Sequence, residues 1–567
     1  MGGLESRLHI DCAAGECFVL SRMIEAFYRV VKVKFFLILL IVPFFIGCGK
    51  KQSGHDLESS SGGRCAQIPF YCSVRSLDPR VANDYPTAHV IRMLYEGLMR
   101  LGPDGEVVPG VAERYEVSED QKTYTFYLRD SKWTNGDPVT AYDFEYAWKK
   151  SVSPQSAQTG AYTFYTILNA AACLEGTVDV DQVGVKALNE KTLVVDLEHP
   201  APYFSYLTCC TTFAPVNKKV DLSNGDWVRN AGSFVSNGPF LLQEWKKDDF
   251  LLLKKSPHYW DNQQVQLSGV NIQIVQDATT QFYLYEKGSL DWLGEPFSPI
   301  ALDIVTDHRL QDRLHYIESM GLSWFFMNTE QFPFTNKNFR KALSLSINRQ
   351  ELVDHVLQMQ EKPATGILGS KLRLQEKPYF HDGDLEAARV HFEMALEELG
   401  VTKEELGPLV VRSRSRSLEI RIIQAIQEQW RKAFGIQVEI EQSDWPVHFT
   451  TISKGNFQIG EMAWFSWIAD PFYMLETFRK RHLSANMCRW EHPLYYQYLD
   501  KADFELDQVK RKELFRNAEA LLMEEMPIIP LYFHNLTYLK NPKLHGVYVS
   551  PLKEIDLKYA YFSSKED

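Results

Sequence analysis

The chain has 567 residues, of which 45% are hydrophobic and 13% aromatic, and this apolar content excludes extensive intrinsic disorder. A formal net charge of −12 argues against a general nucleic-acid binder, because such proteins neutralise phosphates with a basic face. The nine cysteines are too sparse for a disulfide scaffold and include no C-x-x-C pair of the kind that zinc sites use. We therefore expect a large, acidic, compact protein with no cofactor, no metal and no nucleic-acid partner.

The N-terminal region has the layout of a signal peptide. Three basic residues between positions 29 and 34 precede an apolar run from 35 to 46, which is followed by Gly47 and Cys48. Such a run covers only about 18 Å of a bilayer core of roughly 30 Å, so a permanent transmembrane helix is the weaker interpretation. A small residue directly before a cysteine resembles the bacterial lipobox, although a chance cysteine is the alternative. We predict lipidation at Cys48 and an extracytoplasmic, membrane-anchored protein.

The segments around this cysteine complete the N-terminal prediction. Met23 is a plausible start, so residues 1–22 are treated as an extension and residues 1–47 as extension plus signal peptide. The polar residues that follow make 48–64 a tether between the anchor and the folded part.

Further along the chain, both strands and helices are predicted. Residues 124–128 and 193–197 alternate apolar and polar side chains, which is typical of half-buried strands. The apolar positions of 385–399 follow the spacing of a helix, with Asp384 as its N-cap and Gly400 as its end.

A strand–helix–strand unit is predicted in the second half of the chain. Residues 409–411 form an apolar strand, 423–434 carry a helical apolar pattern that ends at Gly435, and 436–440 form a second strand. A βαβ unit implies parallel strands and a covered sheet, so the fold class is α/β.

The sequence contains no dinucleotide-binding, P-loop, zinc-protease or nucleophile-elbow motif, so nothing specific suggests an enzyme. Its most unusual segment is aromatic: Trp464, Phe465, Trp467 and Phe472 surround Asp470. A carboxylate among apolar neighbours is costly unless it is paired. Asp470 therefore needs a partner, either an internal cation or a bound one.

Several long segments resemble the peptide-binding family of substrate-binding proteins of ABC importers, and they occur in the family's order. The likeness extends over roughly residues 70 to 550 and is nearest to the oligopeptide-binding proteins. The matching segments are "LDP" at Leu77, "YEVSEDQKTYTFYLRDSKWTNGDPVTAYDFEYAWKK" from Tyr115 to Lys150, "NGPFLLQEW" at Asn237, "SPHYWDN" at Ser256, "FFMNTEQFPFTNKNFRKALSLSINR" at Phe325 and "MPIIPLYF" at Met526.

This resemblance implies a three-lobed clamshell in which two α/β lobes are joined by a hinge of two chain crossings. Hinge closure is an established route to ligand capture. The implied boundaries are 65–95, 197–296 and 537–567 for lobe I, 96–196 for the inserted lobe II, and 297–536 for lobe III.

The resemblance also implies a ligand site. In the family an Asp in a W-x-x-D loop binds the free α-amino group of the peptide, and Asp470 matches it in "WFSWIAD", beside Trp464 and Trp467. The further lining residues that the resemblance implies are Asn83, Tyr85, Tyr162 and Trp445.

The family's basic positions for a ligand carboxylate are not basic here. They fall at Glu461 or Trp464, near Glu419 and near Gln331. Arg412, Arg414 and Arg416 end the predicted strand at 409–411 and are expected to share one face. They form either a solvated basic edge, just before the helix whose start holds Glu419, or, as our hypothesis, a place where Arg414 or Arg416 meets the ligand's carboxylate or an acidic ligand side chain.

The function implied is that of a monomeric receptor, without cofactor, that captures extended peptides and delivers them to an ABC permease and its ATPase subunits. Within the family the alternatives are a cell-wall peptide, dipeptide, nickel or haem receptor. From other classes they are an extracytoplasmic hydrolase and a chaperone-like peptide binder.

Overall fold

The computed structural model describes residues 63–81, 84–102, 105–155 and 161–564. The predicted signal peptide, the lipidation site Cys48, nearly all of the tether and the lining residue Asn83 lie outside these ranges. Within the described ranges, none of the helices combines the length and apolarity that a bilayer crossing requires.

The first sheet joins distant parts of the chain. Strand β1 (Cys65–Phe70) runs parallel to β10 (Gly269–Ile274), and β9 (Phe250–Lys255) and β8 (Phe240–Lys246) continue the sheet in antiparallel order. The next strand of this sheet along the chain after β1 is β8, so the residues between Phe70 and Phe240 form an excursion from the sheet. Helix α2 (Tyr85–Leu94) follows β1 and is capped by the Asp84 side chain, which accepts a hydrogen bond from the Thr87 amide.

The excursion contains a second sheet of four antiparallel strands. Their order is β4 (Ala112–Val117), β5 (Thr123–Leu128), β7 (Thr192–Asp196) and β6 (Val185–Asn189). The alternating burial of β5 and β7 confirms the strands predicted at 124–128 and 193–197. Helix α3 (Ala141–Ser151) lies against β6 and β7. The remaining short elements of this half are β2 (Met99–Leu101), β3 (Val107–Pro109), α4 (Ala170–Leu174), α5 (Phe204–Leu207), α6 (Lys218–Ser223), α7 (Ala278–Glu286) and α8 (Leu302–Val305).

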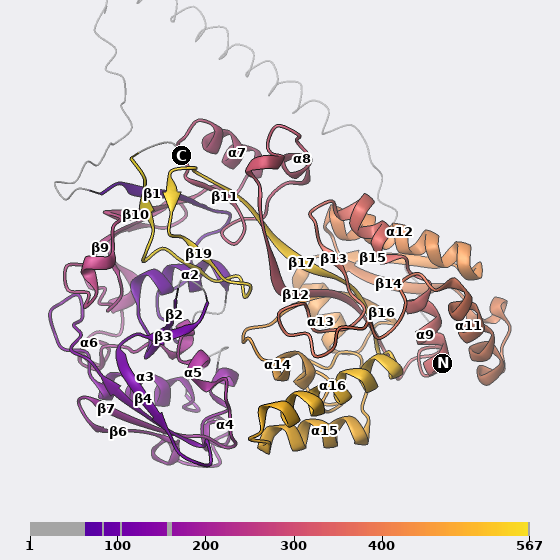
Figure 1. The fold of residues 1–567 in the computed structure, drawn as a ribbon, viewed down its shortest axis with the longest axis horizontal. Coiled ribbons are helices and arrows are strands. Elements are labelled where there is room, and N and C mark those ends of the chain that lie inside the picture. Colours follow the sequence, from indigo (N-terminus) through magenta and orange to yellow (C-terminus); the bar gives the residue numbers. More distant parts are fainter. Residues whose placement is uncertain (1–62, 82–83, 103–104, 156–160, 565–567) are drawn as a thin grey trace, which may run out of the picture. The chain divides into compact units, whose positions relative to one another are not determined.

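The largest sheet has the order β11–β17–β12–β16–β14–β15. Its two longest strands, β12 (His315–Met327) and β17 (Ile528–Lys540), are antiparallel partners that extend together from β11 (Trp292–Gly294) to β16 (Ile459–Phe465) (Figure 1). A bulge between Glu318 and Leu322 interrupts their register. Short β13 (Lys362–Pro363) pairs with β17 outside the main order.

The predicted βαβ unit is confirmed. Strand β14 (Leu409–Arg414), helix α12 (Ser417–Phe434) and strand β15 (Val438–Ser443) follow one another, and the two strands are parallel. Gly435 ends the helix with φ 71°, a conformation that a residue without Cβ adopts at little cost. Helix α11 (Leu385–Leu399) is confirmed as well, with the Asp384 side chain accepting from the Ala387 amide and Gly400 at the end.

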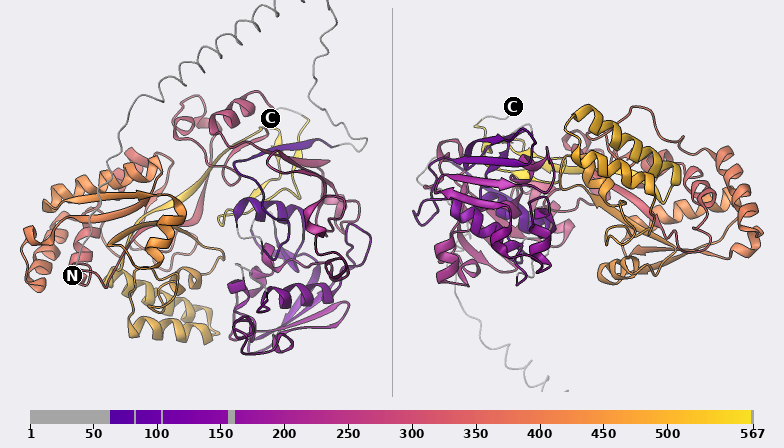
Figure 2. Two further views of the ribbon diagram at one scale, coloured as in Figure 1. Left: turned by 180° about the vertical axis from the view of Figure 1, so that it is seen from behind. Right: turned by 90° about the horizontal axis from the view of Figure 1, so that it is seen from below.

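Side-chain alternation along β12 divides the second half of the molecule into two cores. Phe325 and Met327 belong to the core beneath α9 (Lys337–Leu345), α11 and α12, whereas Trp324 and Phe326 belong to the core with α15 (Pro493–Phe504) and α16 (Gln508–Glu525). Successive side chains of a strand point to opposite faces, so one strand supplies both cores. Helices α15 and α16 lie side by side in both views of Figure 2.

A separate core contains the first two sheets together with the C-terminal segment. It includes residues between Ala66 and Phe297 and, from the end of the chain, residues between Leu536 and Ala560. The C-terminal segment thus shares its core with the N-terminal half of the chain. Its short strands are β18 (Leu544–His545), β19 (Tyr548–Val549), β20 (Ile555–Asp556) and β21 (Tyr561–Phe562).

Candidate functional site

Asp470 is the N-cap of helix α14 (Pro471–Glu476), and its Oδ1 accepts a hydrogen bond of 2.9 Å from the Phe472 amide. The same carboxylate is bound by the guanidinium of Arg511 from α16, with Nη1–Oδ2 at 2.8 Å and Nη2–Oδ1 at 3.0 Å. Both side chains are buried. A bidentate pair of this kind is a strong charge-assisted interaction.

Asp470 therefore already has a cation. Of the two partners left open by the sequence, an internal cation or a bound one, the structure shows the internal one, Arg511. The sequence does not show this partner, because Arg511 is 41 residues away and the packing of α16 against α14 brings the two side chains together. The binding of a ligand ammonium by Asp470 stays a prediction. An ammonium at Asp470 would be a second cation, not the first.

Beside Asp470, the structure brings together two of the predicted lining residues. Trp467 stacks on Tyr85, with ring centroids 5.3 Å apart and the planes within 5°. Trp467 follows β16 and is 37% exposed, while Tyr85 is the first residue of α2. A stacked aromatic pair is favourable beyond the area it buries. The contact joins the W-x-x-D loop of the second half to the segment after β1 in the first half.

Other rings extend this aromatic contact. Phe472 stacks on Tyr203 with centroids 5.5 Å apart, and Tyr203 is buried. Trp464, by contrast, packs against the buried Trp324 at 6.1 Å. The indole Nε1 of Trp464 is buried and finds no hydrogen-bond acceptor within the described part of the chain.

Arg414 is held by two carboxylates. Its Nη2 lies 2.9 Å from Glu461 Oε1 and 3.0 Å from Glu419 Oε1, and Arg416 Nη1 lies 3.3 Å from the same oxygen of Glu419. Burial alone would lower the pKa of Arg414, but Glu461 and Glu419 outweigh it and raise that pKa above its usual value. The ring of Trp445, which is 47% exposed, lies 5.6 Å from the Arg414 guanidinium.

These contacts distinguish the members of the arginine stretch. Arg414 is only 18% exposed and is held by Glu461 and Glu419, so it is not part of a solvated edge. Arg416 is 56% exposed and Arg412 is paired with Glu441 at 2.6 Å, and a ligand contact of Arg414 or Arg416 stays a prediction. The carboxylates of Glu419 and Glu461 both bind Arg414. The packing of β14 beside β16 creates this cluster.

The remaining predicted residues are not placed in detail. Tyr162 belongs to a short 3-10 helix, Ala161–Phe164, but its side chain is outside the described part of the structure, as is Asn83.

Sequence reasoning missed a cation of this region, Lys553. Its Nζ lies 4.4 Å from the ring centroid of Phe465 and 5.6 Å from that of Tyr85. No motif marks it, because it lies in a C-terminal turn whose neighbours in space come from both halves of the chain.

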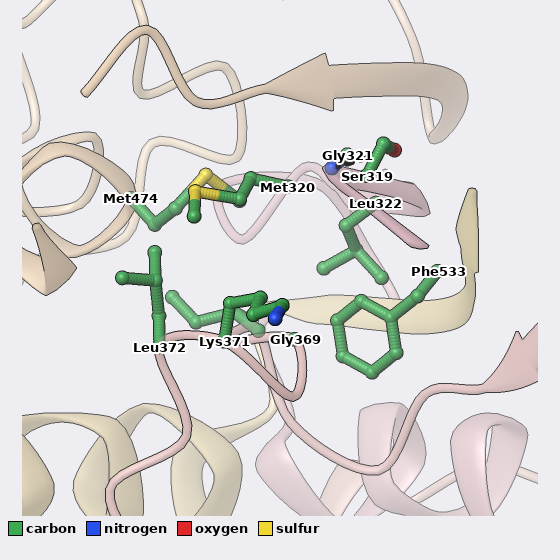
Figure 3. Close-up of a pocket in the computed structure, with 10 residues that line it drawn as sticks. Ser319, Met320, Gly321, Leu322, Gly369, Lys371, Leu372, Met474 and Phe533 are labelled. Atoms are coloured by element: carbon green, nitrogen blue, oxygen red, sulfur yellow. Dashed lines mark hydrogen bonds between the residues drawn. The ribbon is translucent and has the colours of Figure 1, made fainter. Parts of the chain in front are cut away.

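A small apolar hollow opens beside the bulge of β12, with a volume of about 10 Å³ (Figure 3). Met320 and Met474 approach each other at one side of it, and Phe533 lies at the other (Figure 3). The main chain of Met320 connects the hollow to the site, since its N–H donates to the Pro551 carbonyl at 2.8 Å and its carbonyl accepts from the Ser466 amide at 2.9 Å. The other lining residues are Ser319, Gly321, Leu322, Ile367, Gly369, Lys371 and Leu372.

The loop at the edge of this hollow is held by a buried carboxylate, Glu519 of α16. Its Oε1 accepts from the amides of Ile367 and Leu368 at 2.9 and 3.1 Å, and its Oε2 accepts from the Tyr379 hydroxyl at 2.8 Å. Burial raises the pKa of Glu519 to about 7. These three hydrogen bonds attach the loop to α16.

Known proteins are similar to this chain in both sequence and fold. Residues 106–483 match the family described as bacterial extracellular solute-binding proteins, family 5. The oligopeptide-binding protein OppA of Bacillus subtilis is 36% identical over 520 residues, which is 91% of this chain and 95% of that protein. The periplasmic murein peptide-binding protein MppA of Escherichia coli is 30% identical, over 83% of this chain and 88% of that protein.

Solved structures of proteins with similar names have a similar fold. The murein tripeptide-binding protein MppA of Escherichia coli has a TM-score of 0.76 at 28% identity and covers 89% of this chain and 99% of its own. Peptide-bound OppA of Listeria monocytogenes has a TM-score of 0.71 at 26% identity, over 89% of this chain and 100% of its own.

The chain therefore belongs to family 5 of the bacterial extracellular solute-binding proteins, and its fold is the three-lobed α/β clamshell of that class. The resemblance to the peptide-binding proteins of ABC importers is confirmed. The relatives named here are described as binding proteins.

Proposed function

We propose that the chain is the lipid-anchored receptor of an ABC importer, which captures extended peptides between two lobes and delivers them to the permease. The observation that carries the proposal is the stack of Trp467 on Tyr85, which joins two segments of the predicted ligand site from opposite halves of the chain. The names of the relatives support the ligand class, since they include oligopeptide-, dipeptide- and murein-peptide-binding proteins.

The lobe boundaries of 65–95 with 197–296 and 537–567, of 96–196 and of 297–536 belong to this proposal. A peptide held extended between lobes can pair its backbone like an added strand, so the site selects length and polarity more than sequence. Waters in side-chain pockets complete hydrogen bonds at little cost, which makes the site tolerant of different side chains. A tethered, closing receptor of this kind needs no covalent chemistry.

Asp470 receives a modified role in this proposal. A carboxylate offers about four lone pairs, and Arg511 and the Phe472 amide use three of them. The fourth, on Oδ2, is the position we assign to the α-ammonium of the peptide. The Asp470 side chain is 12% exposed, which leaves a narrow approach. Arg511 then fixes the orientation of the carboxylate, while the ligand supplies the last hydrogen bond.

The test begins with native mass spectrometry of the purified chain, because enclosed peptides often copurify. Isothermal calorimetry then compares a tripeptide that has a free amine with its N-acetylated form. We expect the free amine to bind at least about tenfold more tightly, because a charge-assisted hydrogen bond contributes about 1.5–3 kcal/mol. Equal affinity for the two forms would contradict the role of Asp470, and no binding of any peptide would contradict the function.

The same samples distinguish the other classes. Peptides that remain intact after incubation are expected of a receptor, and their cleavage would indicate a hydrolase. Tight binding of internal segments that lack a free amine would favour the chaperone-like alternative.

A further inference from the structure

Lys553 occupies a turn whose backbone conformation is unusual for its residue type. It lies between β19 and β20 with φ +64°, in the left-handed region that favours glycine. The turn is well fixed: the Lys553 amide donates to the Ser550 carbonyl at 3.0 Å, and the Ser550 amide donates to the Glu554 carbonyl at 2.8 Å. A lysine kept in a strained, fixed position is a reason to ask what its side chain does.

The Lys553 ammonium lies between rings from both halves of the chain. Phe465 comes from the end of β16 and Tyr85 from the start of α2, and Tyr85 is the ring on which Trp467 stacks. The lysine side chain is only 17% exposed. Removal from water strengthens the attraction of an ammonium for any carboxylate that reaches it.

The pairing of Lys553 inside the protein is loose. Its Nζ lies 3.4 Å from both Oε1 and Oε2 of Glu295, which is longer than the roughly 2.7–2.9 Å of a strong N–H···carboxylate bond. The neighbouring arginines are held more tightly, Arg511 at 2.8 Å by Asp470 and Arg414 at 2.9 Å by Glu461. Among the largely buried cations described at this site, Arg511, Arg414 and Lys553, the lysine is thus the one held least tightly. Arg416, at 3.3 Å from Glu419, is 56% exposed and lies at the surface of the cluster.

We propose that Lys553 is the residue of this site that binds a ligand carboxylate, because none of the positions where the resemblance implies a basic residue is basic in this chain. The carboxylate belongs either to the C-terminus of a short peptide or to an acidic side chain of a longer one. The inference rests on the proposed peptide-binding function and adds a substrate preference to it. In this scheme Glu295 holds the ammonium loosely until the ligand carboxylate displaces it.

The test is Lys553→Asn, which removes the charge with a residue that tolerates the left-handed backbone. Calorimetry uses the tripeptide Ala-Ala-Ala as free acid and as C-terminal amide, and the amidated pair Ala-Glu-Ala and Ala-Gln-Ala. We expect the variant to bind one carboxylate ligand at least about tenfold more weakly and its neutral partner unchanged. A loss of affinity for the free acid Ala-Ala-Ala identifies the C-terminal carboxylate as the group that Lys553 binds. A loss of affinity for amidated Ala-Glu-Ala identifies the acidic side chain instead.

Three further variants serve as controls. Lys553→Arg should keep most of the wild-type affinity for the carboxylate ligand, because it keeps the positive charge that Lys553→Asn removes. Glu295→Gln should bind the same carboxylate ligand several-fold more tightly, because it removes the internal competitor. Lys247→Asn, which removes an exposed lysine 5.8 Å from the Trp245 ring, should change nothing.

Unchanged affinities in both pairs for Lys553→Asn, in a chain whose wild type binds peptides, would overturn the inference and leave the receptor function intact. Weaker binding by Glu295→Gln would also overturn it. A wild type that binds none of these peptides, nor any that copurify, would instead overturn the receptor function.

Discussion

Arg511 decides how Asp470 can act, because the two side chains form a buried bidentate pair. Removing one partner of such a pair leaves the other charge buried and unpaired, which typically lowers the free energy of unfolding by about 3–5 kcal/mol. Any experiment on the ligand role of Asp470 must therefore separate affinity from stability.

We predict that Asp470→Asn lowers the affinity for free-amine peptides by at least about tenfold, and lowers the melting temperature as well. The double variant Asp470→Asn with Arg511→Met should regain stability, since no charge is left unpaired, but not affinity. Calorimetry and thermal unfolding measure the two effects. If the double variant again bound free-amine peptides as tightly as the wild type, Asp470 would only neutralise Arg511 and would not bind the ligand.

Glu519 gives a second prediction at the scale of the residue. Its folded-state pKa of about 7 lies above the ordinary glutamate value of 4.5, so the folded protein holds this proton more tightly than the unfolded chain does. Stability from this group is therefore complete below pH 4.5 and is lost as the pH rises to 7, by a few kcal/mol at most.

Glu519→Gln should flatten this dependence, because a neutral amide can still accept from the Ile367 and Leu368 amides. We expect thermal unfolding between pH 5 and 8 to show a smaller fall in stability for the variant than for the wild type. Parallel curves for the two proteins would contradict the assignment. Glu361 and Glu476, whose pKa values burial also raises to about 7, contribute the same trend in both proteins.

At the scale of elements, the helices and strands predicted from local pattern are present where local chemistry specifies them. Helix α11 begins at its Asp384 cap and ends at Gly400, and the βαβ unit of β14, α12 and β15 ends its helix at Gly435. Capping bonds and glycine φ angles act within a few residues, so the sequence alone displays them.

Helix α11 therefore offers a direct test. Asp384→Ala removes the side chain that accepts from the Ala387 amide, and we expect a loss of about 1 kcal/mol in the free energy of unfolding by urea. The neighbouring Glu386→Ala should lower the free energy of unfolding by only a few tenths of a kcal/mol, because it removes a favourable charge near the helix N-terminus but no capping bond. Equal losses would show that the cap bond is not what begins the helix.

The two halves of the described chain are joined by β17, whose residues Leu536 and Tyr538 belong to the first core, and by aromatic contacts such as Trp467 on Tyr85. Since the predicted lining residues come from both halves, a bound peptide should stabilise their arrangement. At a peptide concentration 100 times its Kd, mass action adds about 2.7 kcal/mol to the free energy of unfolding.

We predict that such a peptide raises the melting temperature of the wild type, and that Trp467→Ala needs a several-fold higher concentration for the same rise, because a stacked pair contributes about 0.5–1.5 kcal/mol beyond its area. Differential scanning fluorimetry measures both. Trp227→Ala removes a buried ring of the first core. It should lower the melting temperature measured without peptide, but not change how that temperature depends on the peptide concentration. An identical dependence for Trp467→Ala and wild type would place the peptide away from this stack.

The sequence by itself determined the α/β class, the βαβ unit and the family, because apolar periodicity, caps and motif order are written along the chain. It also singled out Asp470, Trp467 and Tyr85. The tertiary structure alone decided the ion pairs of the site: Arg511 reaches Asp470 across 41 residues, Glu461 reaches Arg414 across 47, and Lys553 reaches Glu295 across 258. The physical reason is that an ion pair depends on distance through space, and neither composition nor local pattern states which distant side chains the packed sheets and helices bring within 3 or 4 Å of each other.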